Sequence, residues 1–209
     1  MRGSRRSAVV SRWSAWRAAA AGVPAELFVE DAWSLVRGAG DVVVELIGGV
    51  EQTAALVEEA LRAGKHVVTA NKALLAERGA SLAQTAAANG VELRYSAAVG
   101  GAVPAIETVM HARRLGKVRA LEAVLNGTTN YVLDQLARGA TWEQAVRAAQ
   151  EAGYAEADPR FDLDGTDAAH KLALLVRAAF GVELEVRQIA REGIDVVSAA
   201  RVRQAHAAG

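Results

Sequence analysis

"DVVVELIGG" (residues 41–49) is a short apolar run, rich in β-branched residues, that ends in two glycines. Such a run, bounded by turn signals, is typical of a buried strand. The next stretch, "TAALVEEALRAG" (53–64), has helical spacing and ends at a glycine, and "HVVTA" (66–70) is strand-like again. A strand, a helix and a strand joined this closely predict two parallel strands with a right-handed crossover.

The same alternation continues toward residue 99. We predict a helix in "KALLAERGASLAQTAAANG" (72–90) and a strand in "VELRYSAAV" (91–99). Strands that alternate with helices through short joins indicate an α/β fold with a doubly wound parallel sheet.

The pattern changes after "GGAVP" (100–104). We therefore predict a second domain of the α+β class that begins near residue 105. Its expected elements are a helix at 105–115, a strand in "VRALEAVL" (118–125), a helix from Asn130, a helix opened by Thr141 with Gln144 as a capping box, and a last helix from Thr166 to Phe180 that ends at Gly181.

Composition limits the classes of function. The 209 residues are 52% hydrophobic, which is ample for a folded core, and no apolar run approaches the roughly 20 residues that a membrane-spanning helix needs. Lysine plus arginine equals aspartate plus glutamate at 24 each, so no global charge favours nucleic acid or an anionic membrane. Cysteine is absent, which excludes disulfides and thiolate chemistry and fits a reducing cytoplasm.

The basic N-terminus contains Arg5-Arg6, which looks like a twin-arginine export signal. Arg12 and Arg17 interrupt the apolar stretch that such a signal needs, so we expect an irregular basic start and a cytoplasmic protein.

Ligands of open parallel sheets bind at the carboxyl ends of the strands. Gly48 and Gly49 follow the first strand here, and Asn71 and Lys72 follow the second. The glycines would leave the backbone bare for a ligand, although they could equally serve only to turn the chain. No G-x-G-x-x-G follows a strand, because "GAGDVV" (38–43) precedes one. Either no nucleotide binds, or the phosphate loop is missing from this chain.

The stretch "YAEADPRFDLDGTDAAHK" (154–171) carries five acids before Lys171. It is not an EF-hand loop, since Gly165 stands fourth after Asp162 and the motif needs glycine at the sixth position. Asp167 and Lys171 are spaced i and i+4 on the predicted last helix, where Lys171 has mainly apolar neighbours. The pair could exchange a proton, or it could be a salt bridge in a solvated loop; the residues alone leave both open.

Four stretches together resemble homoserine dehydrogenase. They are "DVVVELIGG" (41–49), "AGKHVVTANKALLA" (63–76), "LNGTTNYVLDQL" (125–136) and "GYAEADPRFDLDGTDAAHKLALL" (153–175), in the family's order. The resemblance implies NAD(P)-dependent interconversion of L-homoserine and L-aspartate 4-semialdehyde, a step toward threonine, methionine and isoleucine. It also implies that residues 1–104 are part of a Rossmann-type NAD(P)-binding domain, and that residues 105–209 are part of a substrate-binding and dimerisation domain.

Individual roles follow from the resemblance. It implies that Lys171 is the proton donor or acceptor, and that Glu156 and Asp167 hold the amino-acid substrate. Lys72 would lie between nicotinamide and substrate, and Gly48, Gly49 and Gly153 beside the cofactor. The remaining acids of the stretch, Asp158, Asp162 and Asp164, are then interpreted as loop and helix-start residues.

A cation site is also implied, because the family binds a monovalent cation such as sodium in a stretch like "YSAAVGGAVP" (95–104). Val99, Gly101 and Val103 would offer backbone carbonyls. Ser96 stands where the family has a glutamate, and the loss of this anionic ligand argues against tight sodium binding.

The ends depart from the family. The strand and glycine-rich loop that begin its cofactor domain are absent, and residues after about 195 are few, so we expect an incomplete Rossmann-type sheet and a chain truncated at both ends. "RRSAVVSRW" (5–13) resembles the second strand, whose Arg12 would meet the 2′-phosphate of NADP; the choice between NADP and NAD stays open.

We expect a small-molecule substrate, no nucleic acid or membrane partner, and a homo-oligomer in the intact enzyme. The alternatives are another two-domain nicotinamide dehydrogenase, or a non-catalytic remnant that only associates with other subunits.

Overall fold

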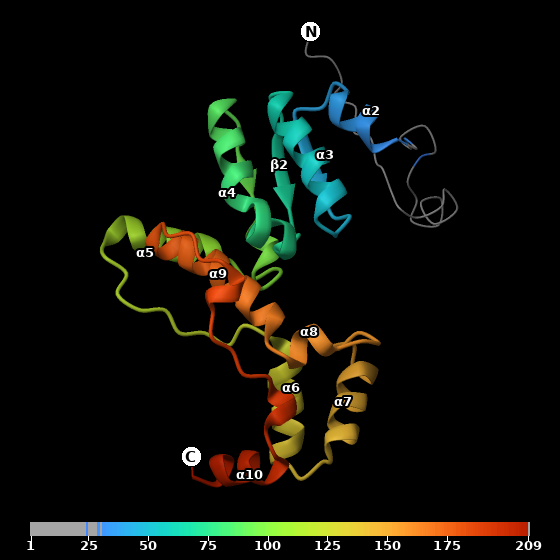
Figure 1. Cartoon of the computed structure of the whole chain (residues 1–209), viewed down its shortest axis with the longest axis vertical. Coiled ribbons are helices and arrows are strands. Elements are labelled where there is room, and N and C mark those ends of the chain that lie inside the picture. The colour runs from blue at the N-terminus through green and yellow to red at the C-terminus, as the bar shows by residue number, and fades with distance from the viewer. Residues whose placement is uncertain (1–23, 25–28, 30, 209) are drawn as a thin grey trace. The chain divides into compact units, whose positions relative to one another are not determined.

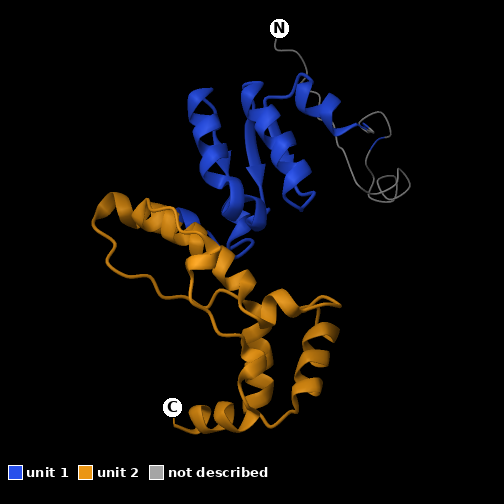
Figure 2. Cartoon of the chain, in the orientation of Figure 1, with its two compact units in different colours: residues 1–107 blue, residues 108–209 orange. Residues whose placement is uncertain are grey.

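The computed structural model describes residues 24, 29 and 31–208, so Arg12 and the stretch 5–13 lie outside the described residues. The chain divides into two compact units, Met1–Glu107 and Thr108–Gly209, which Figure 2 shows in different colours. The boundary falls inside helix α5 (Ala105–Leu115). Each unit is described by itself below.

The described residues of unit 1 form a three-stranded parallel sheet in the order β1 (Val42–Glu45), β2 (His66–Thr69) and β3 (Leu93–Arg94). Val43 is in register with Val67, and Val67 with Leu93. Strands that follow one another in the sequence are therefore neighbours in the sheet, which confirms the predicted α/β fold with parallel strands.

Helices α2 (Ala32–Arg37), α3 (Glu51–Arg62) and α4 (Lys72–Ala88) contribute to the core of unit 1. Figure 1 shows α3 and α4 alongside β2. Val43 and Val67 pack with apolar side chains of these helices, whereas Val42 and Val44 on the opposite face are exposed. The alternation of buried and exposed residues along β1 and β2 follows from the two-residue repeat of a strand.

The third strand is shorter than predicted. Only Leu93 and Arg94 pair with β2, because Ser96–Ala98 form a 3₁₀ helix, η2, that ends the extended conformation. The predicted strand over 91–99 is therefore wrong in its second half.

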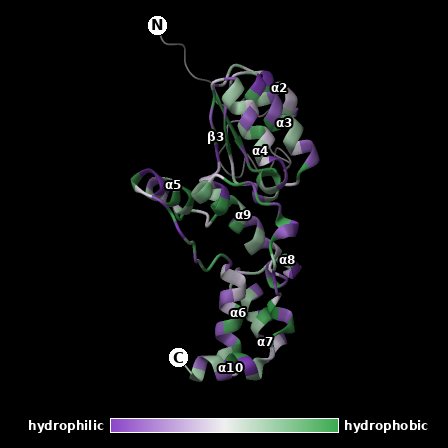
Figure 3. Cartoon of the chain, turned by 60° about the vertical axis from the view of Figure 1, so that its left-hand side comes forward, coloured by the Kyte–Doolittle hydropathy of each residue, from purple (hydrophilic) through white to green (hydrophobic). Residues whose placement is uncertain are grey.

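The described part of unit 2 is helical. Its elements are α6 (Gly127–Ala137), α7 (Trp142–Glu151), α8 (Arg160–Leu163), α9 (Thr166–Phe180), η3 (Val186–Gln188), η4 (Ile194–Val196) and α10 (Ala199–Ala207). Val132 and Leu136 of α6 share one core with Ala145 and Ala149 of α7. Hydrophobic and hydrophilic residues both occur along α6, α7 and α10, as expected for helices with one buried face (Figure 3).

Helix boundaries in unit 2 follow local capping chemistry. Thr141 and Gln144 form the predicted capping box at the start of α7, and α9 spans Thr166–Phe180 as predicted and ends at Gly181, whose φ is 70°. Helix α6 begins at Gly127, before the predicted Asn130, because the side chain of Asn126 already accepts the backbone N–H of Thr129.

The predicted strand at 118–125 is wrong, since residues 117–126 form no regular secondary structure and Val124 is exposed. A strand needs a neighbour to satisfy its backbone N–H and C=O groups, and no strand follows β3 among residues 95–208. Residues 118–125 therefore have a strand-like pattern but no neighbouring strand with which to pair.

Candidate active site

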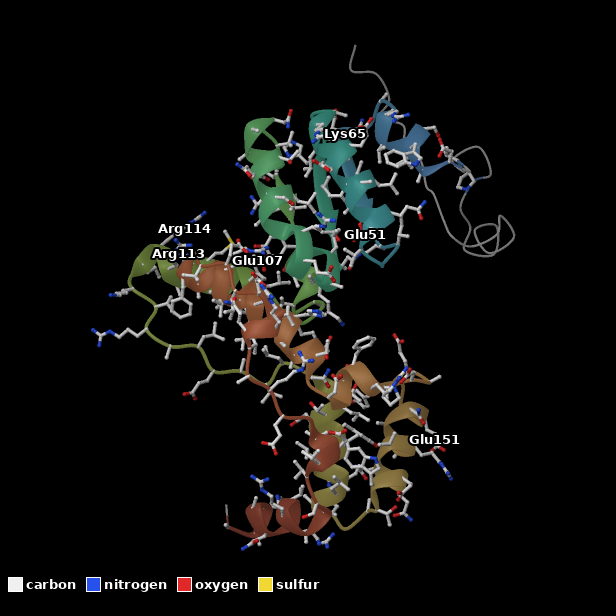
Figure 4. All side chains as sticks on the ribbon, in the orientation of Figure 1. Glu51, Lys65, Glu107, Arg113, Arg114 and Glu151 are labelled. Carbon is white, nitrogen blue, oxygen red and sulfur yellow. The ribbon has the colours of Figure 1, made fainter. Side chains whose placement is uncertain are left out.

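The first candidate region is the end of the sheet where β1 and β2 finish, here called the carboxyl edge and marked by Glu45 and Thr69. Two residues labelled in Figure 4 help to locate the edges of the sheet. Glu51, at the start of α3, marks the carboxyl edge, and Lys65, just before β2, marks the opposite edge. The side chain of Glu45 is buried, with 3% exposed. One of its oxygens accepts the N–H groups of Ile47 (2.7 Å) and Gly48 (3.1 Å), and the other accepts the hydroxyl of Thr69 (2.5 Å). A buried carboxylate thus fixes the turn that follows β1.

Asn71 links this turn to the second strand. Its amide donates to the carbonyl of Gly49 (2.6 Å), and its side-chain oxygen accepts the N–H of Leu74 and so caps α4. From α3, the hydroxyl of Thr53 donates to the carbonyl of Gly48 (2.7 Å). The two glycines are therefore held from both strands and both helices.

Gly48 and Gly49 both have positive φ, 79° and 75°, and a Cβ at either position would meet no atom within 4 Å. Open space borders the bare backbone, and side chains other than glycine would be strained here. These residues fit the close approach of a flat cofactor. The half-buried Lys72 is the first residue of α4, next to Asn71.

The second candidate region lies in unit 2 and centres on Lys171. Its Nζ is 2.6 Å from Oδ2 of Asp167, one turn earlier on α9, and donates to the carbonyl of Leu125 at 2.9 Å. The side chain of Asp167 is 3% exposed and that of Lys171 is 17% exposed. The ion pair predicted from helical spacing is present, and it is largely buried.

Two further residues belong to this region, and sequence reasoning missed both. The amide Nδ2 of Asn126 donates to Oδ1 of Asp162 (2.6 Å) and to Oδ2 of Asp167 (2.8 Å). Asp162 is therefore not only a loop or helix-start residue, as interpreted from the sequence. We call Leu125, Asn126, Asp162, Asp167 and Lys171 the lysine cluster.

The predicted substrate ligand Glu156 lies outside these contacts. It is exposed, and in the part of the chain that the structure describes no hydrogen bond joins its carboxylate to Asp167 or Lys171. The neighbouring loop is anchored instead by Tyr154, whose carbonyl accepts the hydroxyl of Thr128 (2.6 Å) and whose ring stacks on Tyr131 with centroids 4.9 Å apart. Gly153 precedes this loop with a φ of 75°.

Asp158 and Asp164 have local partners. Hydrogen bonds from Arg160 hold the pKa of Asp158 below its usual range. Burial acts to raise the pKa of Asp164, but hydrogen bonds from Thr166 and the charges of Arg191 and Arg160 lower it overall. Both acids fit the predicted loop and helix-start roles.

The predicted cation loop contains a contact that the sequence did not suggest. The hydroxyl of Ser96 donates to Oε2 of Glu107 at 2.6 Å, so a carboxylate lies beside the position where the resemblance implies a glutamate. Within residues 24, 29 and 31–208, no group of three His, Cys, Asp or Glu side chains could hold a metal ion. An ion in this loop would therefore depend mainly on backbone carbonyls.

Two family models match segments of the chain that contain these regions. The model of the family described as "Homoserine dehydrogenase" matches residues 104–209, and "Homoserine dehydrogenase, NAD binding domain" matches residues 4–96. The chain belongs to the homoserine dehydrogenase family. The resemblance carried by the four sequence stretches is thereby confirmed.

Curated homoserine dehydrogenases are similar over most of this chain. The enzyme from Corynebacterium glutamicum is 43% identical over 190 residues, which are 90% of this chain and 43% of that protein. The enzyme from Pseudomonas aeruginosa is 43% identical over 170 residues, 81% of this chain and 39% of that protein. The chain therefore spans less than half the length of these relatives.

Solved structures agree with this assignment. The crystal structure of a homoserine dehydrogenase from Thiobacillus denitrificans has a TM-score of 0.85 and 38% identity, covering 92% of this chain and 45% of that one. A hyperthermophilic archaeal homoserine dehydrogenase in complex with NADPH has a TM-score of 0.71 and 25% identity, covering 80% of this chain and 52% of that one. Among the described residues of this chain, no helix has the length and apolar character to cross a membrane.

Proposed function

We propose that this chain is part of an NAD(P)-dependent oxidoreductase that interconverts L-homoserine and L-aspartate 4-semialdehyde, a step toward threonine, methionine and isoleucine. The observation that carries the proposal is the 2.6 Å ion pair of Lys171 and Asp167, inside the segment that the homoserine dehydrogenase model matches. Residues 1–104 would contribute to cofactor binding and residues 105–209 to substrate binding.

Lys171 would carry the proton. In the reductive direction its ammonium donates a proton to the carbonyl oxygen of the semialdehyde, which becomes the hydroxyl of homoserine, and in the reverse direction the neutral amine takes that proton back. When bound, a nicotinamide cofactor would supply hydride to the carbonyl carbon of the semialdehyde, or take hydride from the corresponding carbon of homoserine. The 17% exposure of the Lys171 side chain leaves part of it open to a substrate, while Asp167 stabilises the charged form.

Glu156 and Asp167 would hold the ammonium group of the amino acid. Both are carboxylates, and an ammonium group is the natural partner of a carboxylate oxygen. The exposure of Glu156 suits a group that first meets its ligand from solvent.

The cofactor would lie along the bare backbone of Gly48 and Gly49, with Lys72 between nicotinamide and substrate and Gly153 also beside the cofactor. Support comes from the open space at the two sheet-edge glycines and from the NADPH complex of the archaeal relative. NADP or NAD would serve, and Arg12, outside the described residues, would select NADP by meeting its 2′-phosphate.

A monovalent cation such as sodium would use the carbonyls of Val99, Gly101 and Val103. The carboxylate of Glu107, held at Ser96, would supply the negative charge. We also propose that the intact enzyme is a homo-oligomer that acts on a small-molecule substrate.

The test is consumption of NADPH by the full chain in the presence of L-aspartate 4-semialdehyde. Lys171→Ala should lower turnover by about 100-fold or more and leave NADPH affinity nearly unchanged, because the proton carrier is lost but the sheet edge is intact. Lys117→Ala is the matched control, since Lys117 is an exposed lysine of the same unit.

Equal turnover in the two lysine variants would reject Lys171 as the proton carrier. If the chain neither consumes NADPH nor changes its fluorescence on titration, the non-catalytic alternative is supported instead.

A further inference from the structure

Asn126 is buried, with 5% exposed, and its side chain contacts two carboxylates at once. We propose that Asn126 is a positioning residue that fixes Asp167 against Lys171 and ties it to Asp162. This inference deepens the proposed function and rests on it for the catalytic role of Lys171.

The orientation of the Asn126 amide follows from its role as helix cap. Its Oδ1 accepts the N–H of Thr129 at 2.8 Å, as is typical of the N-cap residue that precedes a helix. The Nδ2 group therefore points the other way, and its two N–H bonds match two acceptors, Asp162 Oδ1 and Asp167 Oδ2. A flipped amide would place its oxygen against both carboxylates and leave Thr129 without its acceptor. The capping bond thus determines that a donor faces the acids.

The backbone beside Asn126 holds the other half of the ion pair. Lys171 Nζ donates to the carbonyl of Leu125, the preceding residue. Residues 125 and 126 therefore contact both members of the pair, the ammonium through a carbonyl and the carboxylate through an amide. Fixing one cap at the start of α6 fixes both contacts on α9.

The charges of the lysine cluster explain why an asparagine suits this place. The cluster contains two carboxylates, Asp162 and Asp167, and one ammonium, Lys171. Neighbouring carboxylates repel each other, and a neutral donor between them stabilises the ionised form of both. Serine could cap α6 but could not donate to two acids, and aspartate could cap it but would add a third negative charge.

Two variants of the full chain separate these roles. Both Asn126→Ser and Asn126→Asp keep a good capping residue, so α6 should still form. In Asn126→Asp the added carboxylate should repel Asp162 and Asp167 and displace Asp167 from Lys171. In Asn126→Ser the hydrogen bond from the Asn126 amide to Oδ2 of Asp167 is lost, so Asp167 should shift as well. Both changes are followed at neutral pH by NMR of ¹³C-labelled lysine and aspartate, with the side-chain resonances assigned from Lys171→Ala and Asp167→Asn.

Activity gives a second readout where the chain is active. In Asn126→Ser, kcat should fall by about 100-fold, because a misplaced proton carrier slows the chemical step. The KM for homoserine should rise as well, because Asp167 would also hold the substrate ammonium. Thr141→Ala is the control, since it removes the cap of α7 in the same unit. It should lower stability and leave the resonances of Lys171 and Asp167, and kcat, unchanged.

Unchanged side-chain resonances of Lys171 in Asn126→Asp and of Asp167 in Asn126→Ser would overturn the proposal, whether or not the chain is active. Shifted resonances in a chain without dehydrogenase activity would support the positioning role and reject only the proposed function. If Asn126→Asp fails to fold, the resonance of Asp167 in Asn126→Ser decides alone.

Discussion

Two asparagines of this chain perform the same local task in different surroundings. Asn71 caps α4 by accepting the N–H of Leu74, and Asn126 caps α6 by accepting that of Thr129. The side-chain NH₂ group of Asn71 donates to the neutral carbonyl of Gly49, whereas that of Asn126 donates to two carboxylates. The same capping chemistry thus holds a loop in unit 1 and a charged cluster in unit 2.

The buried carboxylates of the two regions also differ in whether their partners are neutral or charged. Glu45 and Asp167 are both 3% exposed. Glu45 is satisfied by two backbone N–H groups and a hydroxyl, all neutral, whereas Asp167 shares one oxygen between an ammonium and an amide. Glu45 therefore acts as a hydrogen-bond acceptor that shapes the backbone, a task that a neutral oxygen could also perform. Asp167 faces an ammonium, and this contact needs its negative charge.

This difference predicts unequal losses of stability on neutral substitution, and the larger of the two is the largest effect that we expect on stability. Asp167→Asn should lower the free energy of unfolding by about 3 kcal/mol, because it leaves the largely buried ammonium of Lys171 without its counter-charge. Glu45→Gln should cost about 1 kcal/mol, because glutamine still offers an oxygen to the N–H groups of Ile47 and Gly48. Urea denaturation of each variant measures the two values.

The double variant Asp167→Asn with Lys171→Met is the control, since it removes both charges. It should recover part of the loss of the single variant. Equal losses of unfolding free energy in Asp167→Asn and Glu45→Gln would show that the charge of Asp167 matters no more than that of Glu45.

Substitutions of Asn71 should change stability less and should distinguish its capping of α4 from its hydrogen bond to Gly49. Asn71→Ala loses both and should cost about 1 kcal/mol, whereas Asn71→Ser keeps a capping oxygen and should cost less. Both variants lose the bond to Gly49, so both should weaken NADPH binding about fivefold, as expected for one hydrogen bond. Fluorescence titration measures the affinity. Wild-type affinity in Asn71→Ser would mean that the Gly49 contact does not serve the cofactor.

Elements governed by local chemistry were predictable from the sequence. The limits of α9 follow from apolar spacing and from the glycine at position 181, and α7 follows from the capping box of Thr141. The Asp167–Lys171 pair was equally accessible, because one helical turn brings i and i+4 together. These predictions needed no knowledge of the rest of the chain.

Features that depend on distant partners were not predictable. The segment 118–125 has a strand-like pattern, but a strand forms only beside another strand. The cap residue Asn126 was recognisable only as part of a family motif, because its acceptors lie 36 and 41 residues further along the chain. Glu107 was missed for the same reason, since its contact with Ser96 crosses from one helix to another.

The smallest expected effect concerns Asp164, which accepts the N–H of Thr166 at the start of α9 (2.8 Å). Burial acts to raise the pKa of Asp164, but the bonds from Thr166 and the charges of Arg191 and Arg160 leave it below its usual range. A carboxyl whose pKa is lower in the folded chain contributes stability above its unfolded pKa of about 3.9, and this contribution is lost as the pH falls through the folded pKa. Wild-type stability should therefore fall more steeply below about pH 4 than that of Asp164→Asn.

Thermal unfolding of both chains between neutral and acidic pH tests this expectation. The control is Ser198→Ala, which removes the neutral hydroxyl cap of α10. Its loss of stability should be the same at every pH, because no titrating group is removed. If the melting curves of Asp164→Asn and wild type run parallel down to the most acidic pH, the ionisation of Asp164 contributes nothing to the start of α9, and its backbone hydrogen bond alone is sufficient.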